Sequence, residues 1–525
     1  MASWRIGNDR LIRFEPALFL LILLAHLLVL FRFEWYPTLD GPAHLYNANL
    51  IKQLLGGDRF LAQFLEFSSF PEPNWSGHAI MAALSTFLPA NWVEKGLVGI
   101  IFIGTALGFR SIWKALAERA PIGSVLIFPF LCAYTLRIGF FNFSISIVAL
   151  LICIAYGLRG RESTSVKRII GLSILFGIVY FSNALTTLIA IGAIIILIGI
   201  DHYRSPKSRS KFWRTLLPVL LASFPWLLLI AFFLLRHSTE GATASLPFEQ
   251  LIAMWWNGSV FTFQTGTSMV VAARVITLCL ATLFILALIE RLRNKGPRSI
   301  AITDGFVLIA FLSLVAFFIL PDKAASGSII SIRYFLFVHL FLALWIASQR
   351  WTLWMQLLIV PFVIADLWLV RADHHFTGEL NDAVIEMRSV LPNVKSGSIV
   401  LPLLYTDNWL HSNFSNYLGT ERSIMVIDNY EAMTPHFPLR WKDEHRAPNS
   451  PRSFFNSNRP CIAIDSLERS MQLRFDHVLR WQIAPGIQDS CTTDLTAQLV
   501  RSYHLSYRSM SNGVELHELK NRADQ

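Results

Sequence analysis

The chain has 525 residues, of which 54% are hydrophobic and only 15% are charged, and its mean hydropathy is +0.48. This composition excludes an ordinary soluble enzyme of the same length and indicates a protein that is largely solvated by lipid. The formal net charge of +10 does not indicate nucleic-acid binding, because the basic residues are concentrated in short loops between apolar segments.

The first apolar segment, Phe14–Phe31, is long enough as a helix to cross most of a bilayer core of about 30 Å. Arg5, Arg10 and Arg13 precede it, and no small-residue cleavage site follows cleanly. These flanks favour an uncleaved anchor with a cytoplasmic N-terminus over a secretory signal peptide. The loop that follows, residues 34–91, is therefore predicted to face outward.

This first outer loop begins with the residues that carry the chemistry. Pro42 predicts the start of a short helix that has an apolar side and lies along the membrane surface. His44 follows Asp40 by one helical turn, so the carboxylate and the imidazole are expected to face one pocket. Asp40 is the candidate catalytic base, and His44 joins it in the catalytic group. A helix cap alone for Asp40 and an interfacial position for His44 are the alternatives.

Two further polar residues of this loop are candidates for substrate binding, Glu72 and His78. Glu72 lies between two prolines, where a solvated turn residue is the simplest interpretation, although it can also supply a second carboxylate. The apolar stretch Ala79–Leu88 ends at Pro89 and is too short to span a bilayer, so it is assigned to the outer interface.

Ten further spans are predicted in the first 370 residues, giving about eleven by span length. They are expected near Trp92–Trp113, Pro121–Leu136, Phe140–Leu158, Ile169–Ser182, Ala184–Ile200, Leu216–Leu235, Val270–Ile289, Ala301–Leu320, Tyr334–Ile346 and Thr352–Val370. Loops predicted to be cytoplasmic carry clusters of Lys and Arg, whereas the opposite loop, His237–Ser268, has neither. The odd number of spans places the C-terminus outside.

From Arg371 onward hydrophobicity falls and strand-like runs alternate with turn-rich segments. The runs are Ser398–Leu404, Ile424–Ile427, Cys461–Ile464 and Val514–Leu519. We therefore expect a polytopic α-helical membrane domain, residues 1–370, followed by an extracytoplasmic α/β domain, residues 371–525. Cys461 and Cys491 of this domain are either bridged or two buried thiols. The segment Asp407–Gly419 is interpreted as a plain polar helix, with a glycan-contact loop as the alternative.

The order of features in the first hundred residues is similar to that of one enzyme superfamily. An N-in span is followed by Asp40, by a helix that ends in Gly57-Asp58, and by the proline-containing segment Pro71–His78. This arrangement resembles the GT-C superfamily of polyprenyl-phosphate-sugar-dependent glycosyltransferases, particularly the bacterial branch related to protein mannosyltransferases and aminoarabinose transferases. Gly41 departs from the pattern, because many members carry a second acidic residue there.

The resemblance implies a multi-pass protein of the bacterial inner membrane with a periplasmic active site. The donor would be a sugar on a polyprenyl phosphate, and a hydroxyl of a lipid, glycan or protein acceptor would displace the phosphate with inversion. The leaving phosphate needs positive charge, for which Arg333 is the first candidate and Lys323 the second. Snorkelling of both side chains to lipid headgroups is the alternative.

The remaining candidates for substrate binding lie near the outer ends of predicted spans. Arg137 and Asn142 lie close to membrane depth, where a charge needs a partner such as Asp40 or a bound phosphate. Trp255 and Trp256 form either an interfacial belt, which is favoured, or a platform for a sugar ring.

Whether a divalent metal ion takes part is open at this stage. Asp40 and Glu72 are the candidate ligands, and the glycine at position 41 puts a metal site of the acidic-pair type in doubt.

Two other function classes are alternatives to a glycosyltransferase of this kind. An O-antigen-type polymerase or ligase usually relies on Arg and His in late loops, and a lipid or polysaccharide transporter should show two related halves.

Overall fold

The computed structural model of the protein describes residues 2–116, 119–160, 165–204, 209–237, 243–263, 267–295, 300–324, 327–446, 462–482, 490–511 and 513–520. The chain forms two compact units, each assembled from two separate stretches of sequence. The first unit is Met1–Arg32 with Val98–His375, and the second is Phe33–Leu97 with Phe376–Gln525. The predicted choice between a bridged and an unbridged pair at positions 461 and 491 lies outside the described residues.

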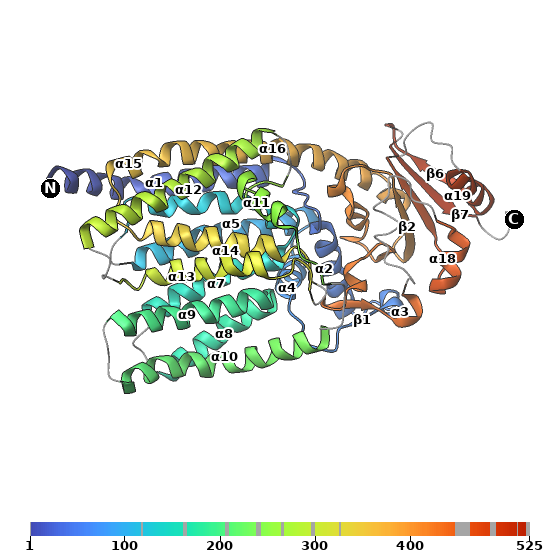
Figure 1. The fold of residues 1–525 in the computed structure, drawn as a ribbon. Coiled ribbons are helices and arrows are strands. Elements are labelled where there is room, and N and C mark those ends of the chain that lie inside the picture. Colours follow the sequence, from blue (N-terminus) through green and yellow to red (C-terminus); the bar gives the residue numbers. More distant parts are fainter. Residues whose placement is uncertain are drawn as a thin grey trace. The chain divides into compact units, whose positions relative to one another are not determined.

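The first unit is a bundle of long apolar helices, several of which run side by side (Figure 1). Its described elements are α1 (Ala2–Arg32), α5 (Ala90–Ala115), η1 (Gly123–Cys132), α6 (Tyr134–Arg137), α7 (Phe141–Arg159), α8 (Val166–Ser182), α9 (Ala184–Arg204), α10 (Arg209–His237), α11 (Phe248–Asn257), α12 (Thr267–Lys295), α13 (Asp304–Ile319), α14 (Ile330–Ala347), α15 (Leu353–Leu357) and α16 (Ile359–Arg388). Helices α5 and α16 continue into the sequence of the second unit.

Each predicted span coincides with helical structure, but not every such helix is long enough to cross a bilayer alone. Among the described residues, eight helices have the length and composition of a membrane span. The segment predicted over Pro121–Leu136 is helical but not one continuous α-helix, because Gly123–Cys132 forms a 3₁₀ helix and Tyr134–Arg137 forms α6. The 16-residue helix α13 is about 24 Å long, shorter than the bilayer core. A multi-pass membrane protein is confirmed, whereas the count of eleven and the orientation stay predictions.

Small residues and paired charges hold the first unit together. A Gly-x-x-x-Gly pattern on α5 lies against α7: a β-carbon on Gly104 would lie 2.6 Å from Val148 Cγ1, and one on Gly108 would lie 2.9 Å from Leu151 Cβ. The buried carboxylate of Glu15 accepts hydrogen bonds from Arg110 and Ser124 at 2.6–2.7 Å. The buried charge of Glu15 is thus neutralised by Arg110, as its desolvation cost requires.

The second unit joins the first outer loop to the C-terminal region. Its helical elements are α2 (Gly41–Leu55), α3 (Leu61–Phe64), α4 (Ser76–Leu84), η2 (Leu391–Asn393), η3 (Trp409–His411), η4 (Phe414–Gly419), η5 (Glu431–Met433), η6 (Asp443–His445), α18 (Ile464–Met471) and α19 (Ser490–Ser502). Its strands are β1 (Leu65–Phe67), β2 (Ser398–Leu404), β3 (Ile424–Val426), β4 (Leu439–Trp441), β5 (His477–Trp481), β6 (Tyr503–Arg508) and β7 (Val514–Leu519).

The predicted α/β character of the C-terminal region is confirmed by a five-stranded sheet of order β3-β2-β5-β7-β6. Strand β2 is parallel to β3 and β5, whereas β7 is antiparallel to β5 and β6. Three of the four predicted strands exist. The fourth is wrong, because Ile464 begins helix α18, and β5 and β6 were not predicted. Strand β1 of the first loop pairs antiparallel with β4, so loop and C-terminal region share a sheet.

Helix α2 occupies the core of this unit rather than presenting one apolar side. Every residue from Gly41 to Ile51 is buried, and the helix packs on α4 and η4. The Tyr46 hydroxyl donates to Ile424 O at 2.8 Å and accepts from Val426 N at 3.0 Å. Because β3 is the edge strand of the sheet, Tyr46 satisfies backbone groups that no further strand pairs. Asn49 Nδ2 adds a hydrogen bond of 2.7 Å to Gly419 O.

Candidate functional site

The start of helix α2 brings the predicted catalytic residues into one place. Pro42 occupies the first turn, as predicted, and the backbone N–H of Gly41 donates to Thr38 Oγ1 at 3.0 Å. Asp40 stands at the N-cap position, yet its side chain makes no capping hydrogen bond to the helix. Helix capping therefore does not account for the Asp40 carboxylate, and Thr38 serves that function instead.

Asp40 is held by the C-terminal region. Its side chain is 6% exposed, and Oδ1 accepts a hydrogen bond of 3.0 Å from Asn413 Nδ2. The same amide nitrogen also donates to Leu39 O at 2.8 Å, which ties Asn413 to the loop backbone. An amide donor on one carboxylate oxygen fixes the orientation of the side chain. Asn413 thus orients the candidate base.

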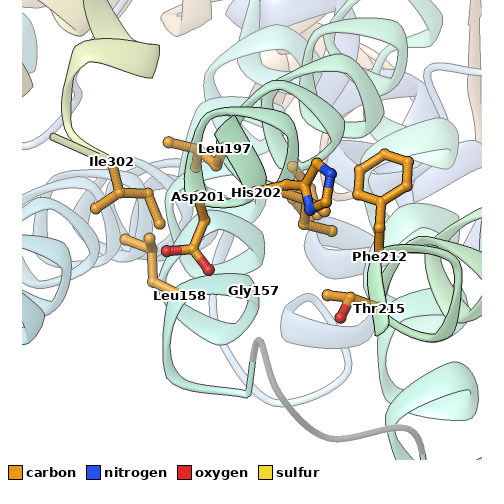
Figure 2. A pocket seen from close by; sticks show the side chains of 10 residues that line it. Gly157, Leu158, Leu197, Asp201, His202, Phe212, Thr215 and Ile302 are labelled. Carbon is orange, nitrogen blue, oxygen red and sulfur yellow. The ribbon is translucent and has the colours of Figure 1, made fainter. Parts of the chain in front are cut away.

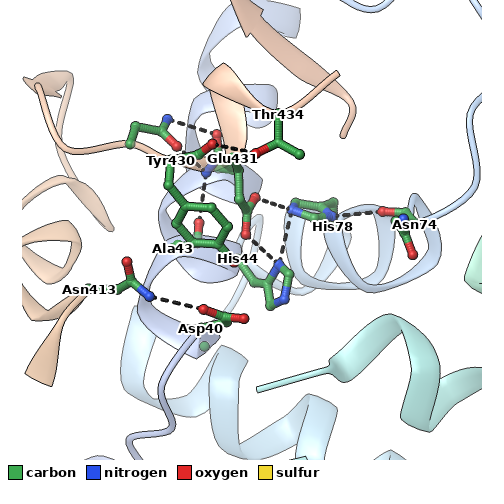
Figure 3. Close-up of polar contacts among 12 residues, drawn as sticks. Asp40, Ala43, His44, Asn74, His78, Asn413, Tyr430, Glu431 and Thr434 are labelled. Atoms are coloured by element: carbon green, nitrogen blue, oxygen red, sulfur yellow. Dashed lines mark hydrogen bonds and ion pairs between the residues drawn. The ribbon is translucent and has the colours of Figure 1, made fainter. Parts of the chain in front are cut away.

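One turn further along α2, His44 meets two residues from distant parts of the sequence (Figure 3). His44 Nδ1 lies 2.6 Å from Glu431 Oε1, and His78 Nε2 lies 2.7 Å from Glu431 Oε2. The two imidazole nitrogens are 3.4 Å apart. All three side chains are buried, with relative exposures of 4% or less. We call these residues the His–His–Glu cluster.

The electrostatics of this cluster favour an ionised carboxylate. Burial alone raises the pKa of Glu431, but the charges of His44 and His78 and their hydrogen bonds outweigh burial and lower it to about 2. His78 Nδ1 lies 3.1 Å from Asn74 O, and the ring of Phe437 packs against both imidazoles. The cluster is thus dry, anionic at its carboxylate and fixed from several sides.

Glu72 differs from its simplest interpretation. A solvated turn residue was expected between the two prolines, but the Glu72 side chain is fully buried. A buried carboxylate needs compensating partners, so Glu72 is part of the interior of the second unit. The group of possible metal ligands among the described residues is His44, His78 and Glu431, and it includes neither Asp40 nor Glu72.

Arg333 and Lys323, the predicted phosphate-binding residues, lie in the first unit. The Arg333 guanidinium stacks on the rings of Phe140 and Phe143, 4.6 and 5.4 Å from their centroids, and donates to Ser328 O at 3.1 Å. Its buried Nε has no hydrogen-bond partner within the described parts of the chain. Lys323 is exposed. Arg333 therefore retains donor capacity for an anion.

Arg137 has a carboxylate partner, but this partner is not Asp40. Arg137 is 2% exposed and forms an ion pair with Asp373 of α16, to whose backbone oxygen it also donates at 3.1 Å. This pair neutralises Arg137 within the first unit, so the structure favours a structural role. Asn142 is buried at the start of α7.

The two tryptophans of α11 have different surroundings. Trp255 is half-buried against the rings of Phe335 and His339, 4.7 and 5.4 Å away. Trp256 is 66% exposed, and Arg274 lies over its ring at 5.1 Å. The exposure of Trp256 fits the interfacial belt, and the sugar platform stays a prediction.

A pocket in the first unit is lined by none of the candidate site residues (Figure 2). It is lined mainly by apolar side chains of α7, α9 and α10, with Asp201, His202 and Thr215 as its polar groups. Gly157, in its wall, is fifteen residues from Asn142 along α7, which corresponds to about 22 Å. The pocket therefore lies toward the helix ends that carry the basic loops predicted to be cytoplasmic.

Sequence patterns missed two residues of the site, Asn413 and Glu431. Asn413 was part of a segment interpreted as a plain polar helix, and Glu431 belongs to a single 3₁₀ turn without periodicity. Asn413 contacts Asp40 at the N-cap of α2 and Glu431 contacts His44 within α2, each across more than 350 positions of sequence. The only local signal was the concentration of polar residues in an otherwise apolar neighbourhood.

No family model and no curated protein sequence matches the chain. Solved structures do match it. One is the crystal structure of ArnT from Cupriavidus metallidurans bound to undecaprenyl phosphate, with a TM-score of 0.54 and 11% identity over 96% of this chain and 97% of ArnT. The chain has the fold of a GT-C glycosyltransferase. Another is the cryo-EM structure of arabinofuranosyltransferase AftD from Mycobacteria, with a TM-score of 0.51 and 13% identity.

The resemblance inferred from the first hundred residues is therefore confirmed at the level of the fold, over 96% of the chain. The chain covers only 40% of the length of AftD, whereas it covers nearly the whole of ArnT. Neither identity is high enough to carry activity or substrate from these proteins to this one.

Proposed function

We propose that this protein is an integral membrane glycosyltransferase that moves a sugar from a polyprenyl phosphate to an acceptor hydroxyl. The observation that carries the proposal is the Asp40 carboxylate, which is buried, held by Asn413 and not used to cap its helix, in a chain with the GT-C fold. The undecaprenyl phosphate bound to ArnT supports a polyprenyl-phosphate donor.

Asp40 acts as the general base of the transfer. One carboxylate oxygen accepts from Asn413, and the carboxylate takes the proton of the acceptor hydroxyl as that oxygen attacks the anomeric carbon. The new glycosidic bond forms while the bond from the anomeric carbon to the phosphate oxygen breaks. Direct displacement inverts the anomeric centre, and the polyprenyl phosphate leaves as a dianion that needs no nucleotide to activate it.

Arg333 stabilises the leaving phosphate. Its guanidinium is positioned by two phenyl rings and one backbone carbonyl, and its Nε donor has no partner among the described residues. A fixed cation costs no reorganisation when charge develops on the phosphate oxygen. Lys323, on the loop before α14, is the secondary cation. The active site faces the periplasmic side of the bacterial inner membrane, and the acceptor is a lipid, a glycan or a protein.

Sugar transfer in membranes tests this function. Membranes that contain the wild-type protein are incubated with polyprenyl phosphates carrying radiolabelled sugars and with a lipid–glycan extract, and the initial rate of transfer is measured. Asp40→Asn keeps an oxygen that can accept from Asn413 but removes the base, so the rate should fall about 10²–10⁴-fold. Glu66→Gln is the matched control, because Glu66 is an exposed carboxylate of the same unit.

Expression level and thermal unfolding are compared for both variants before rates are interpreted. Equal rates for wild type and Asp40→Asn would refute the assignment of the base. Absence of transfer from every donor tried, by a wild-type protein that is folded in the membrane, would refute the glycosyltransferase itself and leave lipid or polysaccharide transport as the function to test.

A further inference from the structure

The His–His–Glu cluster has a composition that sugar transfer by Asp40 does not require. We propose that His44, His78 and Glu431 form a binding site for a zinc-like divalent transition-metal ion. This inference is independent of the proposed transfer reaction, because metal binding can be measured without donor or acceptor. It rests on geometry, donor type, support of the ligands and exclusion of water.

The separations of the ligand atoms fit a single small ion. Each residue offers one ligand atom, and these atoms all lie within 4.8 Å of one another. Atoms bound to a tetrahedral ion at about 2.0–2.1 Å are about 3.3 Å apart. The distance of 3.4 Å between His44 Nδ1 and His78 Nε2 matches this value. The contacts of 2.6 and 2.7 Å to Glu431 are shorter than this value. The carboxylate would therefore shift by a few tenths of an ångström when an ion binds.

The donor types select the class of ion. Two imidazole nitrogens with one carboxylate suit zinc and its neighbours, whereas calcium and magnesium prefer oxygen ligands alone. Three protein ligands leave a fourth position for water or another small ligand, as in zinc sites that are not purely structural.

The ligands are supported in the way that metal ligands usually are. His78 Nδ1 donates to Asn74 O at 3.1 Å, and in the neutral imidazole this tautomer directs the lone pair of Nε2 into the cluster. Asn74 itself has a φ of 71°, in the left-handed region, so its backbone is held in an uncommon conformation next to the site.

The surroundings shield the ligands from bulk water and limit their movement. The Phe437 ring centroid lies 5.9 Å from that of His44 and 5.7 Å from that of His78, and the two imidazoles pack edge to face at 5.0 Å. His44 is on α2, His78 on α4 and Glu431 on η5, so three separate elements of one compact unit fix the ligands. A site of this kind is assembled by folding, and the ion in turn stabilises the fold.

Cobalt titration of the full-length protein tests the site. Purified protein in detergent is treated with a chelator, exchanged into chelator-free buffer and titrated with Co²⁺, whose visible absorption reports coordination by nitrogen and oxygen. The expected result is one equivalent of bound Co²⁺ with the intense bands of four-coordinate geometry. Added Zn²⁺ should displace it, and elemental analysis should find one zinc ion per chain.

His78→Gln and Glu431→Gln should each weaken Co²⁺ binding by more than about 100-fold, beyond the effect of losing only a supporting partner. His504→Ala is the matched control, because His504 is an exposed histidine of β6. If a variant fails to fold, the thermal unfolding of wild-type protein still decides, because Co²⁺ should raise its unfolding temperature. No spectral change and no shift in wild type would overturn the proposal, as would binding that the cluster variants leave intact.

Discussion

The substitution Tyr46→Phe removes one hydroxyl group. It should lower the stability of the second unit much more than the loss of a tyrosine hydroxyl usually does. Tyr46 is fully buried, donates to Ile424 O and accepts from Val426 N, and both residues of β3 are themselves buried. Phenylalanine leaves this N–H and this C=O without the hydroxyl, and water cannot reach them. An unsatisfied buried group costs about 1–3 kcal/mol, so the two together should cost about 2–6 kcal/mol.

Hydrogen exchange and thermal unfolding measure this effect. Because membrane proteins often unfold irreversibly, apparent unfolding temperatures are compared at one scan rate. Exchange of the peptide that contains β3 should accelerate selectively in Tyr46→Phe. Tyr203→Phe is the matched control, since Tyr203 is 72% exposed on α9. Gly419→Ala perturbs the same contact independently, because its new β-carbon would lie 2.2 Å from Tyr46 Cε2.

The outcome that refutes the reasoning is a Tyr46→Phe protein with wild-type exchange at β3 and an unfolding temperature equal to that of Tyr203→Phe. In that case the hydroxyl would contribute nothing to the edge of the sheet, and the link between α2 and β3 would depend on packing alone. Loss of protection in Gly419→Ala but not in Tyr46→Phe would point to the same conclusion.

Three further predictions follow from single contacts. Asn413→Ala should lower the rate of sugar transfer about 10–100-fold through misplacement of Asp40, with thermal unfolding as the check that the protein is folded. Burial raises the pKa of Asp428 from 3.8 to about 7, so the folded state binds its proton more tightly and wild-type stability should fall as pH rises through this interval, by up to about 4 kcal/mol. In Asp428→Asn this decline, followed by unfolding temperature against pH, should be absent. Asp373→Ala strands the Arg137 charge at depth and should cost about 3–5 kcal/mol, measured as a lower unfolding temperature, whereas an unchanged temperature would contradict the pairing.

Local sequence signals predicted the helices well because each depends on a contiguous run of residues. The span Phe14–Phe31 lies within α1, and Pro42 lies in the first turn of α2. The predictions fail where the type of a helix or the burial of a side chain depends on other parts of the fold. The segment Gly123–Cys132 forms a 3₁₀ helix, and Glu72 is buried by parts of the fold that the loop sequence does not contain.

The candidate site was only half predictable for the same reason. The spacing of Asp40 and His44 on one helix can be read from the sequence, because a helical turn fixes their separation. Their partners Asn413 and Glu431 cannot be identified in this way. Asn413 is the N-cap residue of one short 3₁₀ helix and Glu431 lies on another, and the sheet sets the positions of both. A site assembled from contacts of such high sequence separation leaves no periodic signal in either segment.

The contacts of the C-terminal region with the first outer loop show whether this region can act as a lid over the candidate site. Strand β1 of the first loop pairs with β4, Tyr46 closes the edge of β3, and Asn413 and Glu431 reach the residues at the start of α2. A lid opens by breaking few contacts, whereas opening here would expose buried hydrogen-bonding groups and an unpaired carboxylate. The C-terminal region is therefore better understood as part of the framework that positions Asp40 and His44, so that substitutions in it should change catalysis and not only access.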